Sequence, residues 1–363
     1  MEKPATMRVF LTGPNPSLLV APGRICSVVW RWVQEAFPDH VGIFFGLPQD
    51  QVVGRMIPLS RGASAAVNFG SLCESARPDV VISIGDDSDA SHVAATLMVG
   101  MAQFKWIHIL IDGERHQKRP YESITDADTV LAIWEHAADQ ASRSGCRNVV
   151  TVSPTSPIML DFAPCKAVEP KKYFLVVTKN FETSNLFYLR DEWRDSGLAE
   201  EGWELLLALN GADPGDFELP TPSMPAGMRH LWSASSLTYG VPDEDMVDMV
   251  KFAWALVDCS LNPATALMAA EAAHLGVGTI ATESPPHGSM GIEDILESTP
   301  LKSASGRLLH VPQQGRLADA FRGAVIQRPL ASRIEPANIM DQLLFHIAGR
   351  KETTLEVEVV RPP

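Results

Sequence analysis

Short apolar runs alternate with segments of helical periodicity along the first half of the chain. A run of β-branched or aromatic residues predicts a strand, whereas apolar residues three and four positions apart predict a helix. The spacing of Val29, Trp32 and Val33, for example, predicts a helix over residues 26–37. Further strands are expected at residues 7–13, 41–46, 78–85, 106–114 and 148–154, a helix at 90–102, and a strand that runs into a helix at 129–145. No element is predicted between residues 47 and 77.

The same alternation resumes at residue 173 and continues toward the C-terminus. Asn262 is a good N-cap, Pro263 suits the first position of a helix and Gly276 suits its end, so residues 259–283 read as strand, capped helix and strand. Residues 213–227 are rich in Pro and Gly and receive no element. The other expected elements are strands at 173–178, 203–209 and 307–312, helices at 185–197, 315–326 and 336–350, and a helix that runs into a strand at 246–258.

Residues 154–172 interrupt this pattern, because they hold four prolines and no clear period. We therefore expect a linker here. Strands that alternate with helices predict a mostly parallel sheet covered on both faces, and 363 residues exceed one ordinary core. We predict an α/β protein with two doubly wound, Rossmann-like domains facing each other across a cleft, residues 1–165 and 170–335.

The charge balance argues against a nucleic-acid partner. The formal net charge is −14, and we find no cluster of Lys and Arg that would neutralise phosphates. The densest basic stretch, residues 113–120, is interpreted as a solvated loop, with a local basic patch as the alternative. Apolar content of 45% with 20% charged residues is typical of a globular protein.

The compartment is predicted from the start of the chain, the apolar runs and the cysteines. The first residues lack the features of a signal peptide, and no apolar run is long enough to span a membrane. The five cysteines are scattered without metal-binding spacing. We therefore expect a cytoplasmic protein with reduced thiols, no membrane span and no structural zinc.

The loops that follow the strands are the places where an open parallel sheet binds ligands. Residues 11–24 follow the first strand, and Gly13, Gly23 and Arg24 could place backbone amides and a cation against an anion. The loop does not spell the GxGxxG dinucleotide fingerprint, and a plain strand-to-helix turn is an equal alternative. In the second half, Lys179 follows the strand at 173–178 and could neutralise a phosphate or be a lone surface lysine.

The segment 259–283 carries one acid, Glu271, in an alanine-rich helix. The amides of Thr265 and Ala266 after Asn262 would be unpaired first-turn donors with the helix dipole behind them. A carboxylate two turns further on suits the paired hydroxyls of a ribose, since it accepts two hydrogen bonds at once. The alternative is an exposed acid on an amphipathic helix.

Four stretches in order are similar to motifs of one enzyme group, the GT-B glycosyltransferases, and within it the retaining nucleotide-sugar enzymes of family 4. The most specific is the last, which resembles "PS..EgFGl..lEAmA.G.Pvia" of that family. The stretches are "TVLAIWEHAADQASRSGCRNVVTVSP" (129–154), "IMLDFAP" (158–164), "YFLVVTKNFETSN" (173–185) and "VPDEDMVDMVKFAWALVDCSLNPATALMAAEAAHLGVGTIATE" (241–283).

The resemblance implies a donor site around Glu271. In the family this acid binds the nucleotide ribose, and the preceding helix N-terminus cradles the diphosphate through backbone amides. The family's diphosphate-binding Arg and Lys fall on Lys179 and Ser184, so one positive charge remains. The loop "PPHGSMGIED" (285–294) matches the donor-contacting loop of the family, which assigns contacts to His287, Gly288 and Ser289.

The sequence also departs from the family. The position eight residues before Glu271, which is the first acid of the E-x7-E pair, is Pro263. The usual glycine pair of the first loop is missing. Asp112 stands closest to the family's catalytic histidine and is either a general base toward an acceptor hydroxyl or a turn residue. "DDSD" at 86–89 has Asp-x-Asp spacing but is interpreted as a helix-capping turn, so we expect no metal.

The function predicted from this resemblance is metal-independent transfer of a sugar from a nucleotide-diphosphate donor to an unidentified acceptor, which is a small molecule, a glycan or a protein. No further cofactor is expected, and by analogy the helix at 336–350 packs back on the N-terminal domain. The main alternative is a catalytically degenerate GT-B protein that binds a partner, and a weaker one is a sugar-nucleotide epimerase. The oligomeric state, the donor base and the stereochemical outcome stay open.

Overall fold

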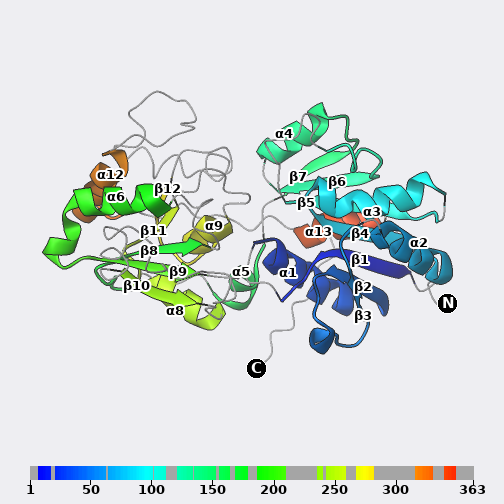
Figure 1. Ribbon diagram of the computed structural model, residues 1–363, viewed down its shortest axis with the longest axis horizontal. Helices are drawn as coiled ribbons and strands as arrows, with labels where there is room; N and C mark the ends of the chain where they lie inside the picture. Colours follow the sequence, from blue (N-terminus) through cyan, green and yellow to red (C-terminus); the bar gives the residue numbers. More distant parts are fainter. Residues whose placement is uncertain are drawn as a thin grey trace.

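The structure, a computed structural model, consists of two parallel β-sheets with helices on both faces (Figure 1). One sheet has seven strands and the other has five, and the pairings within both are parallel. The structure describes residues 7–17, 21–62, 64–100, 102–111, 121–133, 135–152, 155–163, 168–178, 186–209, 235–239, 243–258, 267–281, 315–329 and 339–348.

The seven-stranded sheet is built from the first half of the chain, and β1 lies inside it, between β2 and β4. The strand order is β3-β2-β1-β4-β5-β6-β7. Phe10 of β1 is in register with Val41 on one side and Val81 on the other. The strands are β1 (Arg8–Pro14), β2 (Asp39–Phe45), β3 (Met56–Leu59), β4 (Val80–Gly85), β5 (Lys105–Leu110), β6 (Thr129–Ile133) and β7 (Val149–Val152).

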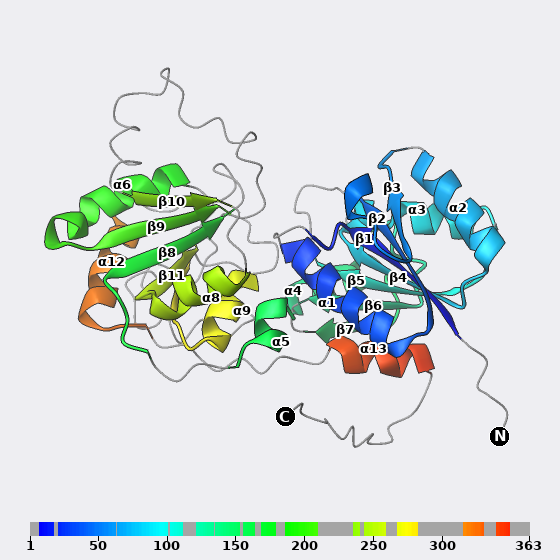
Figure 2. The same cartoon turned by 90° about the horizontal axis from the view of Figure 1, so that it is seen from below.

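Helices cover both faces of this sheet because its strands are apolar on both sides. All six residues of β4 and all five of β6 are buried. The helices that follow these strands are α1 (Ala21–Ala36), η1 (Gln49–Gln51), α2 (Ser64–Ala76), α3 (Asp87–Met98), α4 (Glu135–Arg143) and α5 (Pro157–Asp161). The helix α13 (Ile339–Ala348), from the end of the chain, also lies against this sheet (Figures 1 and 2). Its His346 carbonyl accepts a hydrogen bond from Lys105 Nζ in β5.

The five-stranded sheet has the order β10-β9-β8-β11-β12. Leu175 of the central β8 is in register with Leu206 and Leu256. The strands are β8 (Tyr173–Thr178), β9 (Glu204–Leu209), β10 (Ser235–Tyr239), β11 (Ala255–Asp258) and β12 (Thr279–Ala281). The helices of this half are α6 (Leu186–Ser196), η2 (Leu198–Glu201), α8 (Asp243–Phe252), α9 (Leu267–His274) and α12 (Arg316–Ile326).

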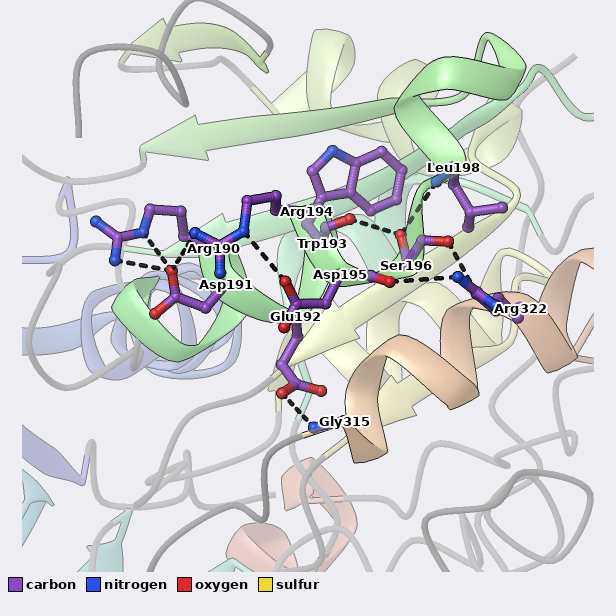
Figure 3. Close-up of polar contacts among 10 residues, drawn as sticks. All are labelled: Arg190, Asp191, Glu192, Trp193, Arg194, Asp195, Ser196, Leu198, Gly315 and Arg322. Atoms are coloured by element: carbon purple, nitrogen blue, oxygen red, sulfur yellow. Dashed lines mark hydrogen bonds and ion pairs between the residues drawn. The ribbon is translucent and has the colours of Figure 1, made fainter. Parts of the chain in front are cut away.

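Helices α6 and α12 are joined by polar contacts at both ends (Figure 3). The buried Glu192 of α6 accepts hydrogen bonds from the backbone amides of Gly315, Leu317 and Ala318, at 2.6, 2.9 and 3.0 Å. Three first-turn donors of α12 are thereby satisfied by one carboxylate. In return, Arg322 Nε of α12 donates to the Ser196 carbonyl in the last turn of α6, at 2.8 Å.

Helix α5 lies between the two halves, in the segment expected to be a plain linker (Figure 2). Its N-cap Ser156 accepts from the Met159 amide, and proline occupies the first helical turn. Ile158 and Met159 are buried in an apolar cluster that also contains residues of α1, α8 and α9. The linker expected over 154–172 therefore contains a short helix that the pattern did not predict, and two apolar side chains in one turn suffice to anchor it.

The pattern-based elements are otherwise largely confirmed where the structure describes them. The first helix is a correction, since α1 begins at Ala21 rather than at Cys26. Besides α5, the elements that were not predicted are β3, α2, β10 and the short 3-10 helices η1 and η2. The expected strand at 307–312 and the Pro/Gly-rich stretch at 213–227 lie outside the described residues. Among the helices that the structure describes, none has the length and apolar character needed to cross a membrane.

Candidate functional site

Two charged side chains from opposite halves of the chain meet in a buried ion pair. Arg24 Nη2 in the first turn of α1 donates to Glu271 Oε1 in α9 at 2.8 Å. The side chain of Arg24 is 3% exposed and that of Glu271 is 0% exposed. Helix α1 follows the carboxyl end of β1, and α9 lies in the chain between β11 and β12. The pair therefore marks where the ligand-binding ends of the two sheets come together (Figures 1 and 2).

The alanine-rich sequence of α9 explains how a carboxylate is buried there. Ala269, Ala270 and Ala272 are fully buried beside Glu271, so the helix packs closely on its neighbours. The chain then leaves the helix through Gly276, whose φ of +78° is a left-handed conformation suited to glycine. The alternative interpretation of Glu271 as an exposed acid is wrong.

Arg24 is placed by the packing of α1 against β1 and β4. Gly13, expected in an anion-binding loop, lies within β1, and a Cβ on it would come within 3.0 Å of the Ile84 carbonyl oxygen. A side chain at residue 13 would therefore press on the β4 backbone, whereas its distance of 3.5 Å to the Cys26 sulfur of α1 is an ordinary contact. Gly23 and Arg24 were expected to precede the helix, but they belong to its first turn.

A second buried polar group lies in the seven-stranded sheet, near the carboxyl ends of β1, β4 and β5. Thr12, Ser83 and His108 are register neighbours on these strands, so their side chains share one face of the sheet. Ser83 Oγ lies 2.8 Å from His108 Nδ1 and accepts from Trp106 Nε1 at 2.7 Å. His92 of α3 completes the group, with its Nε2 3.0 Å from Thr12 Oγ1.

Burial keeps both imidazoles of this group neutral. Desolvation lowers the pKa of His108 to about 3 and the pKa of His92 to about 4. A neutral imidazole bonded to a hydroxyl through one ring nitrogen is a core group rather than a cation. His108 is 0% exposed within β5.

The acidic turn before α3 is a helix cap, as predicted. Asp86 is the N-cap residue, and its Oδ1 accepts from the Asp89 amide at 2.8 Å. Asp89 packs against Gly85 and forms an ion pair with Arg61 at 2.8 Å. Burial and the neighbouring Asp86 raise the pKa of Asp89, partly offset by Arg61. In the part of the chain that the structure describes, three or more His, Cys, Asp or Glu side chains nowhere gather in a metal-binding group.

The remaining predicted site residues lie outside the described residues. They fall at chain positions that follow strand ends, such as β5 for the expected general base and β8 for the expected phosphate ligand. These residues are Asp112, Lys179, Ser184, Asn262, Thr265, Ala266, His287, Gly288 and Ser289.

The partnership of Arg24 with Glu271 was not predicted. The two residues are 247 positions apart, which no local pattern spans. One signal was nevertheless present, because the positive end of the helix dipole disfavours a cation in a first turn. An arginine at that position therefore suggests an acidic partner from elsewhere in the chain.

No protein-family model matches the chain, and no curated protein matches it by sequence. Solved structures do. A sucrose-phosphate synthase from Thermosynechococcus elongatus has a TM-score of 0.61 at 16% identity, with 90% of this chain and 92% of that chain covered. The fold is GT-B.

Two further similar structures carry different activities on the same fold. The lipopolysaccharide outer core galactosyltransferase WaaB has a TM-score of 0.53 at 18% identity, covering 80% of this chain and 88% of that chain. A putative UDP-N-acetylglucosamine 2-epimerase from Listeria monocytogenes has a TM-score of 0.60 at 12% identity, with coverages of 96% and 98%. At these identities the likeness shows the fold alone, because one fold hosts many functions.

Proposed function

We propose that this GT-B protein is a glycosyltransferase that moves a sugar from a nucleotide-diphosphate donor to an acceptor that is still to be identified. The observation that carries the proposal is the buried carboxylate of Glu271 opposite Arg24. A buried ion pair adds little net stability compared with apolar residues of the same volume, so packing does not explain it. A carboxylate between two Rossmann-like sheets suits the two hydroxyls of a ribose.

The proposed roles of the other residues follow from the family resemblance. Residues 170–335 form the donor domain, while residues 1–165 with the helix at 336–350 form the acceptor domain. In the donor domain, the amides of Thr265 and Ala266 after Asn262, together with Lys179, receive the diphosphate. Ser184, at the second of the family's two diphosphate-binding positions, contributes no charge. His287, Gly288 and Ser289 contact the donor.

The proposed chemistry needs a base and a stabilised leaving group. Asp112 accepts the proton of the acceptor hydroxyl as that oxygen attacks the sugar carbon. The bond from this carbon to the diphosphate oxygen breaks, and the helix amides and Lys179 stabilise the charge that develops on the departing diphosphate. No metal ion is required in this scheme. Uridine diphosphate is the donor nucleotide to test first, since one structurally similar protein is a putative UDP-N-acetylglucosamine 2-epimerase.

Two other functions are each favoured by one specific observation. Pro263 replaces the first acid of the E-x7-E pair, which favours a protein that binds without turnover. The likeness to an epimerase of nearly the same length favours epimerisation of a UDP-sugar.

The test combines binding and turnover. Thermal unfolding is followed with UDP, GDP, ADP and TDP for the wild type, Glu271→Ala and the exposed-site control Glu201→Ala, with and without EDTA. A nucleotide at one hundred times its dissociation constant stabilises the folded state by about 2.7 kcal/mol. We expect one nucleotide to stabilise the wild type and the control in both buffers, but not Glu271→Ala.

Turnover then separates the three functions. The corresponding nucleotide sugars are incubated with the protein, with water as the default acceptor, and the products are read by NMR. A transferase releases nucleoside diphosphate and free sugar. An epimerase inverts one sugar carbon, and a binding protein gives stabilisation without product. Absence of both stabilisation and product contradicts the proposal.

A further inference from the structure

Three cations lie over three aromatic rings beside the amino ends of β8, β9 and β11. We call this group the cation–aromatic cluster, and its pairs are Lys171 over Phe252, Lys172 over Trp203 and Arg328 over Trp254. The cationic groups lie 5.0, 5.9 and 5.7 Å from the ring centroids, which is the range of cation–π contacts. The rings of Trp203 and Trp254 meet edge to face, with their centroids 5.0 Å apart. Because Lys171 and Lys172 are adjacent in the chain, the cluster is one contiguous feature.

Hydrogen bonds fix one end of the cation–aromatic cluster in place. Arg328 Nε and Nη2 donate to the backbone carbonyls of Trp254 and Ala253, each at 3.0 Å. The indole Nε1 of Trp254 donates to the carbonyl of Ala324 in α12 at 2.7 Å. The ring and the guanidinium are therefore ordered before any partner binds. Such order lowers the conformational entropy that binding must remove.

The cations of the cluster lack carboxylate partners in the part of the chain that the structure describes. None of the three forms an ion pair there. Glu169 stands two positions before Lys171, and the Glu204 amide donates to the Lys172 carbonyl at 3.0 Å, but neither acid pairs with a lysine of the cluster. Burial lowers the pKa of Arg328. In a chain with 44 acidic and 30 basic residues, three neighbouring cations without an acid are anomalous.

The cluster lies at the outer end of the molecule. The amino ends of the five-stranded sheet point away from the seven-stranded sheet, whereas the carboxyl ends point toward it (Figures 1 and 2). Lys171 and Lys172 are exposed, while Phe252 and Trp254 are half-buried. A partner that docks on this end therefore leaves the carboxyl ends of the strands, where parallel sheets bind ligands, uncovered.

We propose that the cation–aromatic cluster is an interaction surface for an acidic segment of a partner protein. Carboxylates of such a segment pair with the exposed ammonium groups, and the aromatic rings beneath them add apolar contact. Tryptophan and arginine are the residues that most often dominate the energy of protein interfaces. The interaction is independent of the proposed sugar transfer.

Two observations favour a protein segment over an anionic membrane. The chain carries a formal net charge of −14, so a bilayer of the same sign repels it over a broad area, whereas a short segment meets only the cluster. The aromatic rings also offer little surface to a bilayer, because Trp203 is 7% exposed and each ring face is occupied by a cation. Membrane binding by a surface patch grows with the apolar area that it inserts.

The experiment measures the binding of fluorescein-labelled deca-glutamate to the full chain by fluorescence anisotropy at low salt. The test variant is Lys171→Gln/Lys172→Gln. The matched control is Arg31→Gln/Arg55→Gln, which removes two exposed cations that pair with Asp161 and Asp39 and changes the net charge equally. We expect the lysine variant to bind the peptide about tenfold more weakly than the wild type, and the control to bind it as the wild type does.

Three outcomes contradict the proposal. The wild type does not bind deca-glutamate at low salt, or the lysine variant binds it as tightly as the wild type, or the control loses as much affinity as the lysine variant, which means that only the net charge matters. Vesicles of phosphatidylcholine with and without phosphatidylglycerol are the second probe. If the wild type sediments with the anionic vesicles but does not bind the peptide, the surface belongs to a membrane and the proposed partner is wrong. Thermal unfolding of each variant verifies that the substitutions at these exposed positions leave the fold intact.

Discussion

Arg24 and Glu271 lie 247 positions apart and form an ion pair that solvent hardly reaches, with Nη2 and Oε1 2.8 Å apart. One partner belongs to the helix after β1 of the seven-stranded sheet, and the other belongs to a helix of the five-stranded sheet. The two halves of the chain are thus joined by charge at the ends of their sheets, in addition to the apolar packing around α5.

The first prediction concerns the stability of this pair. Glu271→Ala removes the carboxylate that pairs with the buried Arg24 guanidinium and should lower the free energy of unfolding by about 3–5 kcal/mol. The double variant Arg24→Met/Glu271→Met removes both charges and should lie within about 1 kcal/mol of the wild type, or above it. Urea unfolding measures the free energy of unfolding of the wild type, Glu271→Ala and the double variant.

The control for this cycle is the exposed pair of Arg31 and Asp161, whose side chains are 46% and 45% exposed. Asp161→Asn should change the free energy of unfolding by no more than about 1 kcal/mol, since solvent screens exposed pairs. A double variant at 24 and 271 that is as unstable as Glu271→Ala argues against charge burial as the cause.

The second prediction concerns the cap that α6 provides for α12. Glu192→Gln keeps the shape of the side chain but replaces one acceptor oxygen by an amide group, so at least one of the three backbone donors loses its partner. The free energy of unfolding should fall by about 1–3 kcal/mol. Hydrogen exchange at the Leu317 and Ala318 amides should accelerate, whereas Glu201→Gln, at an exposed acid of the same domain, should leave it unchanged.

The third prediction is a pH dependence from the two buried histidines. The pKa of His92 is lowered to about 4 and that of His108 to about 3, against 6.5 for an ordinary histidine. Above pH 6.5 both the folded and unfolded chains are neutral at these sites, so the histidines add no pH dependence there. As the pH falls below 6.5, the unfolded chain binds a proton at each site and the folded chain does not.

The free energy of unfolding should therefore fall between pH 6.5 and pH 4, by up to about 1.4 kcal/mol per pH unit for each histidine. His92→Gln and His108→Asn imitate the bonded ring nitrogens without titrating. Each substitution should lower the slope of the free energy of unfolding against pH by up to about 1.4 kcal/mol per pH unit, which is the contribution of one proton. Urea unfolding at several pH values measures this, and slopes equal to that of the wild type in both variants would falsify the assignment.

The fourth prediction concerns thiol reactivity. Burial raises the pKa of the Cys73 thiol to about 12 and that of Cys26 still further above its ordinary value. Because the thiolate is the reactive form, neither should react with iodoacetamide at pH 8 in the folded protein. Peptide mass spectrometry should show both modified only after denaturation. Rapid labelling of Cys26 in the folded chain would mean that α1 leaves its place against β1.

The fold was predictable because its strands are continuous apolar runs and its helices carry a clear period. β1, β2, β4 and β8 each fall within two residues of their expected ends. The missed β3 is an edge strand that contains Pro58 and has one fully buried residue, so its pattern is weak. Helix α2 buries Gly70 and Cys73 beside Ala65 and Phe69, and such a mixture gives no clear apolar stripe.

The candidate site was only half predictable. Glu271 was recognisable because a lone acid among alanines is anomalous in a helix. Arg24 was singled out as well, but for an anion from solution rather than for an acid of the same chain. A contact across 247 positions depends on how the two sheets pack, and no local pattern encodes that packing.

The central claim is that Glu271 belongs to a nucleotide site, and calorimetric titration of UDP into the wild type and Glu271→Gln tests it most directly. Glutamine preserves the volume and one acceptor oxygen, so a change reports the lost carboxylate rather than a cavity. We predict that the wild type and the control Arg31→Met bind UDP with equal affinity. The affinity of Glu271→Gln for UDP should be lower by about tenfold or more. Equal affinity of the wild type and Glu271→Gln would contradict the account.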